Sequence, residues 1–343
     1  MTRLTLLLCC AVFYAASARA DGCTTFSING SYANSFQYYR FYDFRSLQET
    51  IIEQNNAFRW DPQVQSLSVN DSSWSRDWEI REQAKAVTGE DTISWNYTAS
   101  NVKIVRSDDS LKEPTTYLTL SATRHSSQLA AEIDFAQKSI LYASIRASVR
   151  VNGASGAVAG IFTYHNDTSE SDIEILTRDP GNNVHYSNQP TTDSANKINP
   201  GSSYNVSMKA GRQWSAWTTH RLDWVPGHSA WYVDGEMAAS TNINVPDAPS
   251  AIILNMWSNG GQWAGRMPNG TEARLDVMWI EMAFNTSTQR DSPSGSTEIR
   301  CSVDKAVGRP TVSAGIASGR NGLEFCLLLP LILATWLFCD LIN

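Results

Sequence analysis

The sequence predicts an all-β protein, a sandwich of two antiparallel sheets, on three observations. From about residue 100 to residue 285, short alternating apolar segments are separated by Gly, Pro, Asn and Asp, the pattern typical of antiparallel strands and their turns. Helical periodicity finds little support in this region. The chain has 343 residues, of which 42% are apolar and 12 are Trp, which is enough to fill one large core.

The expected strands follow one another at short intervals. They are residues 115–124, 139–151, 156–164, 171–178, 220–225, 229–240, 250–257 and 273–284. Asp234-Gly235 divides 229–240 into a hairpin, since this pair supplies the positive φ that a tight turn requires. Residues 21–99 are rich in aromatic and polar residues without a clean period. We expect strands and long loops that cover the sandwich there, with a separate small domain as the alternative.

The first 20 residues have the layout of a secretory signal peptide. Arg3 precedes an apolar run, and Ala18-Arg19-Ala20 has the small-x-small form that signal peptidase cleaves. The alternative is a signal anchor that stays in the membrane, but the run is too short to cross about 30 Å of hydrocarbon. We therefore expect an exported protein.

The C-terminus has the layout of a glycosylphosphatidylinositol (GPI) attachment signal. The small residues Ser313-Ala314-Gly315 precede a mostly polar spacer, Ile316–Glu324, and an apolar tail, Phe325–Cys339. The alternative is a transmembrane helix, but the four residues after the tail include an Asp and no base, whereas a single-pass anchor carries Lys or Arg on its cytoplasmic side. We expect attachment at Ser313, removal of residues 314–343, and a Ser/Thr-rich stalk over residues 286–313 that follows the β-sandwich domain of residues 21–285.

Cysteine and sequon usage agree with export. Removing both ends leaves only Cys23 and Cys301, which we expect to form a disulfide in an oxidising compartment, with two free thiols as the alternative. Seven N-x-[ST] sequons predict surface glycosylation sites: Asn29, Asn70, Asn96, Asn166, Asn205, Asn269 and Asn285. The formal net charge of −7 disfavours a nucleic-acid binder, which needs excess Lys and Arg to neutralise phosphates.

The candidate chemistry lies in residues 170–174, ESDIE. On a strand, alternate side chains share a face, so Glu170, Asp172 and Glu174 line up together. The outer Cα atoms are then about 13 Å apart, and two long Glu side chains leaning over the shorter Asp could approach to about 5–6 Å. Crowded carboxyls cannot all ionise cheaply, so one should keep a proton near neutral pH while another stays charged. The alternative is a solvated acidic stripe.

This region resembles glycoside hydrolase family 16, the concanavalin-like β-jelly-roll glucanases and transglycosylases. The resemblance covers roughly residues 100–285 and rests on ESDIE (170–174), HRLDWVPGHSAWYVDGE (220–236) and IILNMWSNGGQWAG (252–265), in family order. It implies that Glu170 is the nucleophile, Glu174 the general acid/base, and Asp172 the residue that orients and tunes the nucleophile. Ser171 departs from the family, which usually has Ile, Leu or Val there. A structural Ca²⁺ is possible by resemblance, but the sequence shows no metal cluster and no cofactor is expected.

Sugar-binding grooves are lined with aromatic side chains that stack on the C–H faces of sugar rings. Trp257 and Trp263, which bracket a Gly-Gly pair, are the main candidates, with Tyr164 and His185 beside the catalytic strand. Core packing is the alternative for each of them.

We therefore expect a monomeric, GPI-anchored, retaining enzyme that acts on β-1,3- or β-1,3-1,4-glucan at the cell surface or wall, by hydrolysis or transglycosylation. The anchor and sequons make it most similar to the fungal cell-wall branch of the family. The competing classes are a non-catalytic glycan-binding protein on the same sandwich and a purely structural wall protein.

Overall fold

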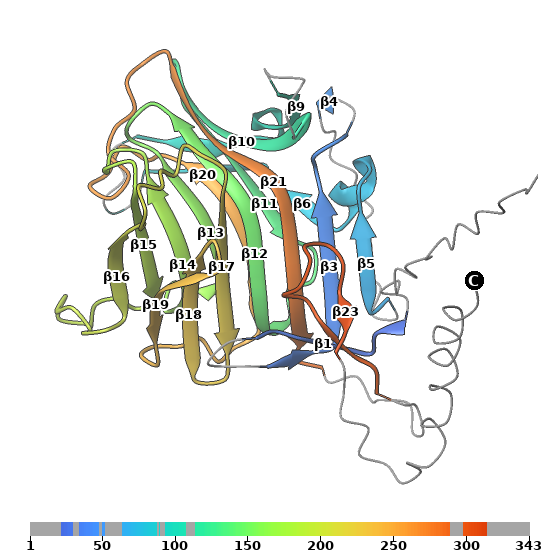
Figure 1. Ribbon diagram of the computed structural model, residues 1–343. Helices are drawn as coiled ribbons and strands as arrows, with labels where there is room; N and C mark the ends of the chain where they lie inside the picture. The colour runs from blue at the N-terminus through green and yellow to red at the C-terminus, as the bar shows by residue number, and fades with distance from the viewer. Residues whose placement is uncertain are drawn as a thin grey trace, which may run out of the picture. The chain divides into compact units, whose positions relative to one another are not determined.

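The computed structural model describes residues 22–29, 34–47, 50–51, 64–87, 89, 93–107, 114–288 and 298–313. Over these residues the chain is almost entirely β, with two short 3-10 turns, η2 (Ser72–Arg76) and η3 (Ala99–Asn101). Two curved antiparallel sheets pack face to face (Figure 1), which confirms the predicted sandwich. The predicted signal peptide and attachment propeptide lie outside the described residues, and no helix within those residues is long and apolar enough to span a membrane.

One sheet, here called the cleft sheet, contains the carboxylate strand. In order across the sheet its strands are β6 (Trp78–Ile80), β11 (Gln128–Phe135), β20 (Ala251–Trp257), β13 (Val158–Asn166), β14 (Ser169–Leu176), β15 (Asn183–Asn188) and β16 (Ser203–Ser207). β8 (Trp95–Tyr97) pairs with the start of β11, and β7 (Gln83–Lys85) pairs with β8. β14 therefore lies inside the sheet, with two strands beyond it on one side.

The other sheet, here called the outer sheet, is built around the longest strand, β21 (Thr271–Thr286). On one side β21 pairs first with β10 (Thr116–Arg124) and then with β3 (Tyr38–Asp43). On the other side follow β12 (Ile140–Gly153), β17 (Thr218–Val225), β18 (His228–Val233) and β19 (Glu236–Thr241). The short strands β4 (Thr50–Ile51), β5 (Ser66–Val69) and β9 (Val102–Arg106) extend its edge.

All eight segments predicted as strands form strands, with bounds shifted by a few residues at most. Asp234 and Gly235 have φ of 48° and 81°, so the hairpin between β18 and β19 turns where the sequence predicts it. Between residues 100 and 285, four strands lie outside the predicted segments: β9, β11, β15 and β16.

Residues 21–99 extend the two sheets. β3 adds to the outer sheet beside β21, and β6 adds to the cleft sheet beside β11. Tyr42, Phe44 and Trp78 are buried in the same apolar core as Ile145 of β12 and Ile173 of β14. Because these side chains share one core with the sandwich, the described part of this region is not a separate domain.

The predicted stalk is wrong over residues 298–312, here called the clamp segment. It forms β22 (Arg300–Ser302) and β23 (Thr311–Val312), and a small sheet in the order β2 (Ser35–Phe36), β1 (Thr25–Ser27), β22 and β23. The compact unit that contains the sandwich extends to Val312. A second apolar cluster, with Phe26, Trp279 and Val303 among its members, buries this segment against the outer sheet.

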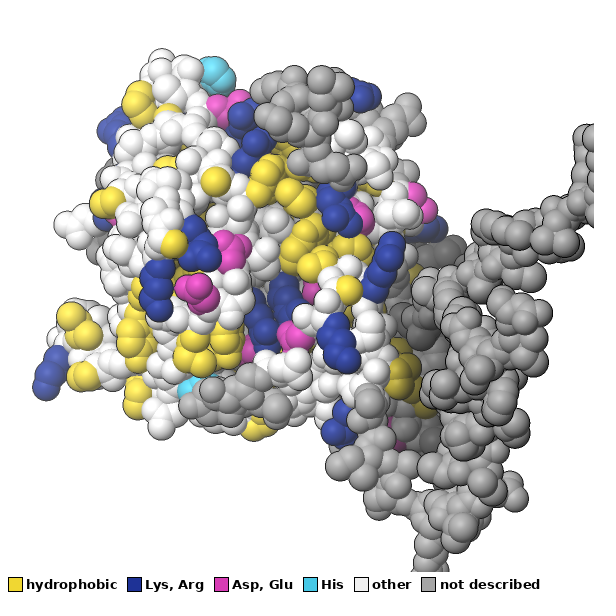
Figure 2. Space-filling model, viewed as in Figure 1, with side chains coloured by type: hydrophobic (Ala, Val, Ile, Leu, Met, Phe, Trp, Pro, Cys, Tyr) yellow, Lys and Arg dark blue, Asp and Glu magenta, His cyan; other side chains and the backbone are white. Residues whose placement is uncertain are grey.

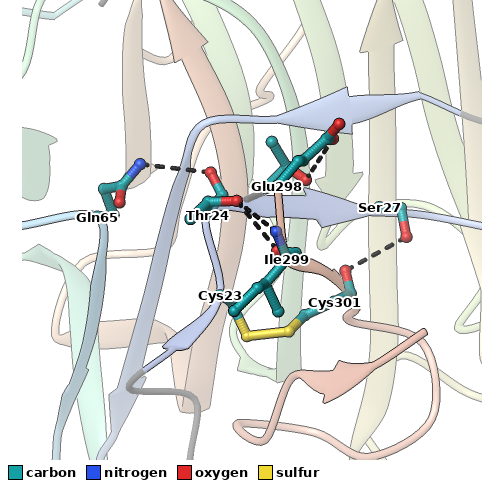
Figure 3. Close-up of a disulfide and its surroundings, with 8 residues drawn as sticks. Cys23, Thr24, Ser27, Gln65, Glu298, Ile299 and Cys301 are labelled. Carbon is teal, nitrogen blue, oxygen red and sulfur yellow. Dashed lines mark hydrogen bonds between the residues drawn. A yellow bond between two sulfur atoms is a disulfide. The ribbon is translucent and has the colours of Figure 1, made fainter. Parts of the chain in front are cut away.

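The disulfide between Cys23 and Cys301 is present, as predicted, and it joins the two ends of the fold (Figure 3). Around it, the backbone N–H of Ile299 donates to Thr24 Oγ1 at 2.8 Å, and Ser27 Oγ donates to the carbonyl of Cys301 at 3.2 Å. A crosslink plus a few apolar side chains can hold a segment whose Ser/Thr-rich composition suggests a linker, because the crosslink removes much of the entropic cost of docking it.

The clamp segment and the carboxylates lie on opposite faces of the sandwich. Arg146 alternates on β12 with core residues Ile145 and Ala147, and its guanidinium forms an ion pair with Asp304 of the clamp segment. Glu174 alternates on β14 with core residues in the same way. In Figure 1, β1 and β23 lie in front of the outer sheet, and Figure 2 shows acidic and basic side chains interspersed on this face.

Candidate active site

β14 presents three carboxyls on the open face of the cleft sheet. Ser171 and Ile173 are buried in the sandwich interior, so strand alternation turns Glu170, Asp172 and Glu174 outward. Although it is on the open face, Asp172 is only 3% exposed, and the two glutamates beside it are half-buried. The three acids therefore sit together at the floor of a depression and not on a solvated stripe.

Burial and mutual repulsion hold protons on this cluster. Loss of solvation, followed by the charge of Asp172, raises the pKa of Glu174 to about 8. The same two causes raise the pKa of Glu170, which also shares a hydrogen bond with Asp172, and burial raises the pKa of Asp172. The pKa of Glu170 is raised to about 10, so at neutral pH the cluster carries fewer than three charges and both glutamates favour their protonated forms.

Neighbouring side chains fix two of the carboxyls. Ser187 Oγ donates to Asp172 Oδ2 at 2.8 Å, and Gln189 Nε2 donates to the same oxygen at 3.4 Å. Trp263 Nε1 donates to Glu174 Oε1 at 3.2 Å. Each of these bonds favours the ionised carboxylate, so they offset part of the pKa rise that burial causes.

Two hollows meet at Glu174. The first, of about 540 Å³, extends over β13, β20 and β11, and is bordered by all three acids together with Tyr164 and Trp257. The second, of about 430 Å³, extends over β15 and β16 and is bordered by Glu174, His185 and Trp263. The shared wall at Glu174 makes them two halves of one cleft that crosses the strands.

Strand register gives this cleft a continuous polar floor. The partners of Glu174 are Gly160 on β13 and His185 on β15. The same ladder continues to Asn255 and Glu132 on the first side and to Asn205 on the second. Partners in a ladder share a face, so these side chains form one row across six strands.

Gly160 is required where this row crosses β13. A Cβ at this position would lie 2.6 Å from Asn255 Oδ1 and 3.3 Å from the Phe162 ring. Any larger residue would therefore displace the Asn255 amide from the cleft floor.

The four side chains predicted to bind substrate all border the cleft. Trp257 and Tyr164 lie in the first hollow, where Trp257 stacks on Trp95 with ring centroids 5.9 Å apart. Trp263 and His185 lie in the second, with their rings edge to face at 4.9 Å. Trp263 is 40% exposed and so offers a free face, whereas His185 is held by Asp179 at 2.6 Å. Their contact with sugar stays a prediction.

The sequence reasoning missed a second polar group in the first hollow. Glu132 is buried, pairs with Arg81 at 3.3 Å, and accepts a hydrogen bond from Asn255 Nδ2 at 3.2 Å. Tyr97 also bonds to Glu132. The available signal was the alternation of Glu132 and Asp134 within an otherwise apolar segment, which places two acids on one face of a strand.

The described residues contain no group of three or more His, Cys, Asp or Glu side chains arranged to hold a metal ion. A position for the structural Ca²⁺ that the resemblance allows is therefore not found within this part of the chain.

The chain matches a family model, curated protein sequences and solved structures. The model of "Glycosyl hydrolases family 16" matches residues 89–281. A β-glucanase of Paenibacillus polymyxa is 26% identical over 152 residues, which are 42% of this chain and 60% of that protein. A β-glucanase of Bacillus licheniformis is 29% identical over 134 residues, which are 36% of this chain and 51% of that protein. The chain thus spans between half and two thirds of the length of these relatives.

Among solved structures, the endo-β-1,3-glucanase of Pyrococcus furiosus superimposes with a TM-score of 0.52 at 15% identity. The alignment covers 77% of this chain and 99% of that one. At this identity the likeness supports the fold, and the chemistry has to be argued from the cleft.

Proposed function

Since the chain belongs to the glycosyl hydrolases of family 16, we propose that it is an endo-acting β-glucanase that cleaves β-1,3 or β-1,3-1,4 links with retention of configuration. One observation carries the proposal: a buried Asp between two half-buried Glu carboxyls on one strand, all with raised pKa values, at the junction of two hollows of one cleft. The named β-glucanases among its relatives support β-glucan as the substrate class.

The geometry supports a distinct role for each acid. Glu174 is protonated below pH about 8 and borders both hollows, so it can give its proton to the glycosidic oxygen between them. Glu170 borders only the first hollow, where its carboxylate attacks the anomeric carbon as the C–O bond breaks. Asp172 takes the proton that it shares with Glu170, which leaves the nucleophile charged at the moment of attack.

In the second step, Glu174 removes a proton from the acceptor hydroxyl, whose oxygen then displaces Glu170 from the sugar. Water as the acceptor gives hydrolysis, and a sugar gives transglycosylation. Both products come from the same covalent intermediate and both retain the anomeric configuration. The first-formed product on a defined glucan oligosaccharide, followed by NMR, should have the substrate's configuration. An inverted product contradicts this mechanism, and products longer than the substrate identify transfer.

The competing proposal is a non-catalytic glycan-binding protein. A binder needs a cleft and aromatic side chains but no proton-holding cluster of acids at its centre. Binding to laminarin and lichenan without any release of reducing ends would support the binder and contradict the enzyme.

We also propose export and a GPI anchor at Ser313, as the layouts of residues 1–20 and 313–339 suggest. Phosphatidylinositol-specific phospholipase C, or acid cleavage if the lipid resists it, should release the protein from membranes. Detection of residues 325–343 in the membrane-bound form by mass spectrometry would show instead that the apolar tail is retained.

A further inference from the structure

One sequon lies inside the cleft. Asn205 of β16 is the ladder partner of His185, which is the partner of Glu174. It is exposed and borders the second hollow together with Glu174 and Trp263. Two strand spacings separate Asn205 from the proposed acid, about 10 Å across the sheet.

The second hollow is the leaving-group side of the cleft. A sugar must lie in the first hollow for Glu170 to reach its anomeric carbon, because Glu170 does not border the second. The fragment that Glu174 protonates then extends over β15 and β16 toward Asn205. β16 is the last strand on this side, pairing only with β15 among the described strands, so Asn205 marks the end of the floor.

The other sequons have different surroundings. Asn96 is exposed between Trp95 and Tyr97, both of which line the first hollow, so strand alternation directs Asn96 away from the cleft. Asn285 is half-buried, and its amide accepts from Gln37 N–H at 2.9 Å. Of the sequon asparagines that the structure describes, only Asn205 borders either hollow.

We infer that Asn205 is N-glycosylated and that its glycan narrows the leaving-group end of the cleft, so that long leaving chains are cleaved more slowly but are not excluded. This inference rests on the proposed function and on export. A branched glycan rooted on the floor occupies the path that a long leaving chain would follow. The enzyme then favours substrates with few sugar units beyond the cleaved bond, and any acceptor sugar must be short. The exposed face of Trp263, whose indole bonds to Glu174 and whose ring contacts His185, is left for that short fragment.

The test compares three full-length variants secreted from a eukaryotic host. S207A removes the sequon and keeps Asn205, N205Q removes the asparagine itself, and N96Q removes a sequon that points away from the cleft. Glycopeptide mass spectrometry first reports whether Asn205 is modified. Each protein is then assayed on a long β-glucan and on an aryl glycoside of a short glucan oligosaccharide, whose small leaving group does not reach β16.

We expect a glycan on Asn205 in the wild type. In S207A and N205Q, the ratio of kcat/KM for the long glucan to kcat/KM for the aryl substrate should rise about tenfold. Without the glycan, the long glucan can bind one more subsite, and a tenfold change is what one such contact would give. N96Q should keep the wild-type ratio. An unmodified Asn205 overturns the inference whatever the activity, and so does a ratio in S207A equal to that in N96Q. If no variant hydrolyses either substrate, the proposed function is overturned, and so is the effect of the Asn205 glycan on substrate length.

Discussion

Both faces of the sandwich bury carboxyls with arginine partners, but the three acids of β14 have none among the described residues. On the outer sheet, Glu281 is 1% exposed and lies 3.6 Å from Arg146, and Asp276 is fully buried and lies 2.8 Å from Arg150. On the cleft sheet, no Lys or Arg within the described ranges forms an ion pair with Glu170, Asp172 or Glu174. Burial raises the pKa of carboxyls on both faces.

The presence or absence of a cationic partner determines whether a buried acid stabilises the fold as an anion or keeps its proton. Arg146 and a hydrogen bond from Tyr39 lower the pKa of Glu281 and oppose the effect of burial. These contacts offset the free-energy cost of burying the charge of Glu281. The Glu281 carboxylate also accepts a hydrogen bond from Gly308 N–H of the clamp segment at 2.9 Å. The three acids of β14 have no such cation, and the pKa values of Glu170 and Glu174 stay above neutral pH.

The largest effect should come from removing the unpaired acids. We expect Glu170→Gln and Glu174→Gln each to reduce hydrolysis of laminarin and lichenan by about 10²–10⁴-fold, because each removes a chemical step and almost no packing. Asp172→Asn should fall in between the wild type and these variants. Near-wild-type rates in both Glu variants would mean that the three acids are not the catalytic group.

The paired acids should respond in stability. Arg146→Met removes the cation beside Glu281 and leaves Asp304 with Arg221 alone, and it should lower the free energy of unfolding by about 3–5 kcal/mol, measured by urea denaturation. Arg274→Met is the matched control, since Arg274 lies 3.8 Å from Glu272 and both side chains are largely exposed. Its cost should be below about 1 kcal/mol. Equal losses of unfolding free energy in the two variants would mean that the buried Arg146–Glu281 pair stabilises the fold no more than an exposed ion pair does.

The unpaired acids should lower stability at alkaline pH. The pKa of Glu174 is about 8 in the folded state against about 4.3 when unfolded, so the folded state binds more protons between these values. Stability is then lost as pH rises through this window. Gln cannot ionise, so Glu174→Gln should raise the melting temperature at pH 9 by roughly 10 °C and leave it unchanged at pH 4. An equal difference at both pH values would attribute the effect to packing.

The smallest effect should be a shift in the pH profile. The indole N–H of Trp263 favours the ionised form of Glu174 and lowers its pKa. Trp263→Phe should therefore raise that pKa, so that the acid keeps its proton to higher pH. The alkaline limb of kcat/KM should move upward by about half a pH unit, worth about 0.7 kcal/mol. Trp257→Phe should change the rate without moving the limb, because Trp257 packs on Trp95.

Local alternation allowed most of the fold and the acid cluster to be predicted. Glu170, Asp172 and Glu174 alternate with Ser171 and Ile173, so the faces of β14 follow from the sequence. β11 was missed because Glu132 and Asp134 interrupt its apolar pattern. Acids that break an apolar pattern are expected where a strand lines a functional cleft. The polar segment of β16 gave no signal either, since a short exposed edge strand buries little.

The row from Glu132 to Asn205 could not be predicted, because it depends on register between strands that are far apart in the chain. The sequence places Asn205 in a sequon, and only the ladder places it beside His185. The clamp segment was misassigned for a related reason. Its composition is that of a linker, and its docking depends on a crosslink to Cys23, 278 residues away.

The joined ends of the chain also determine how the fold would carry mechanical load. Tension applied after Val312 passes through β23 to β22, and at Cys301 the disulfide divides it between two routes. One route leads back along the chain to β21, and the other leads through Cys23 and β1 to β3. β21 and β3 are adjacent strands of the outer sheet. The pull would therefore be shared by a pair of strands on the far side of the sandwich, and β14 with its three acids would stay out of the path of the force.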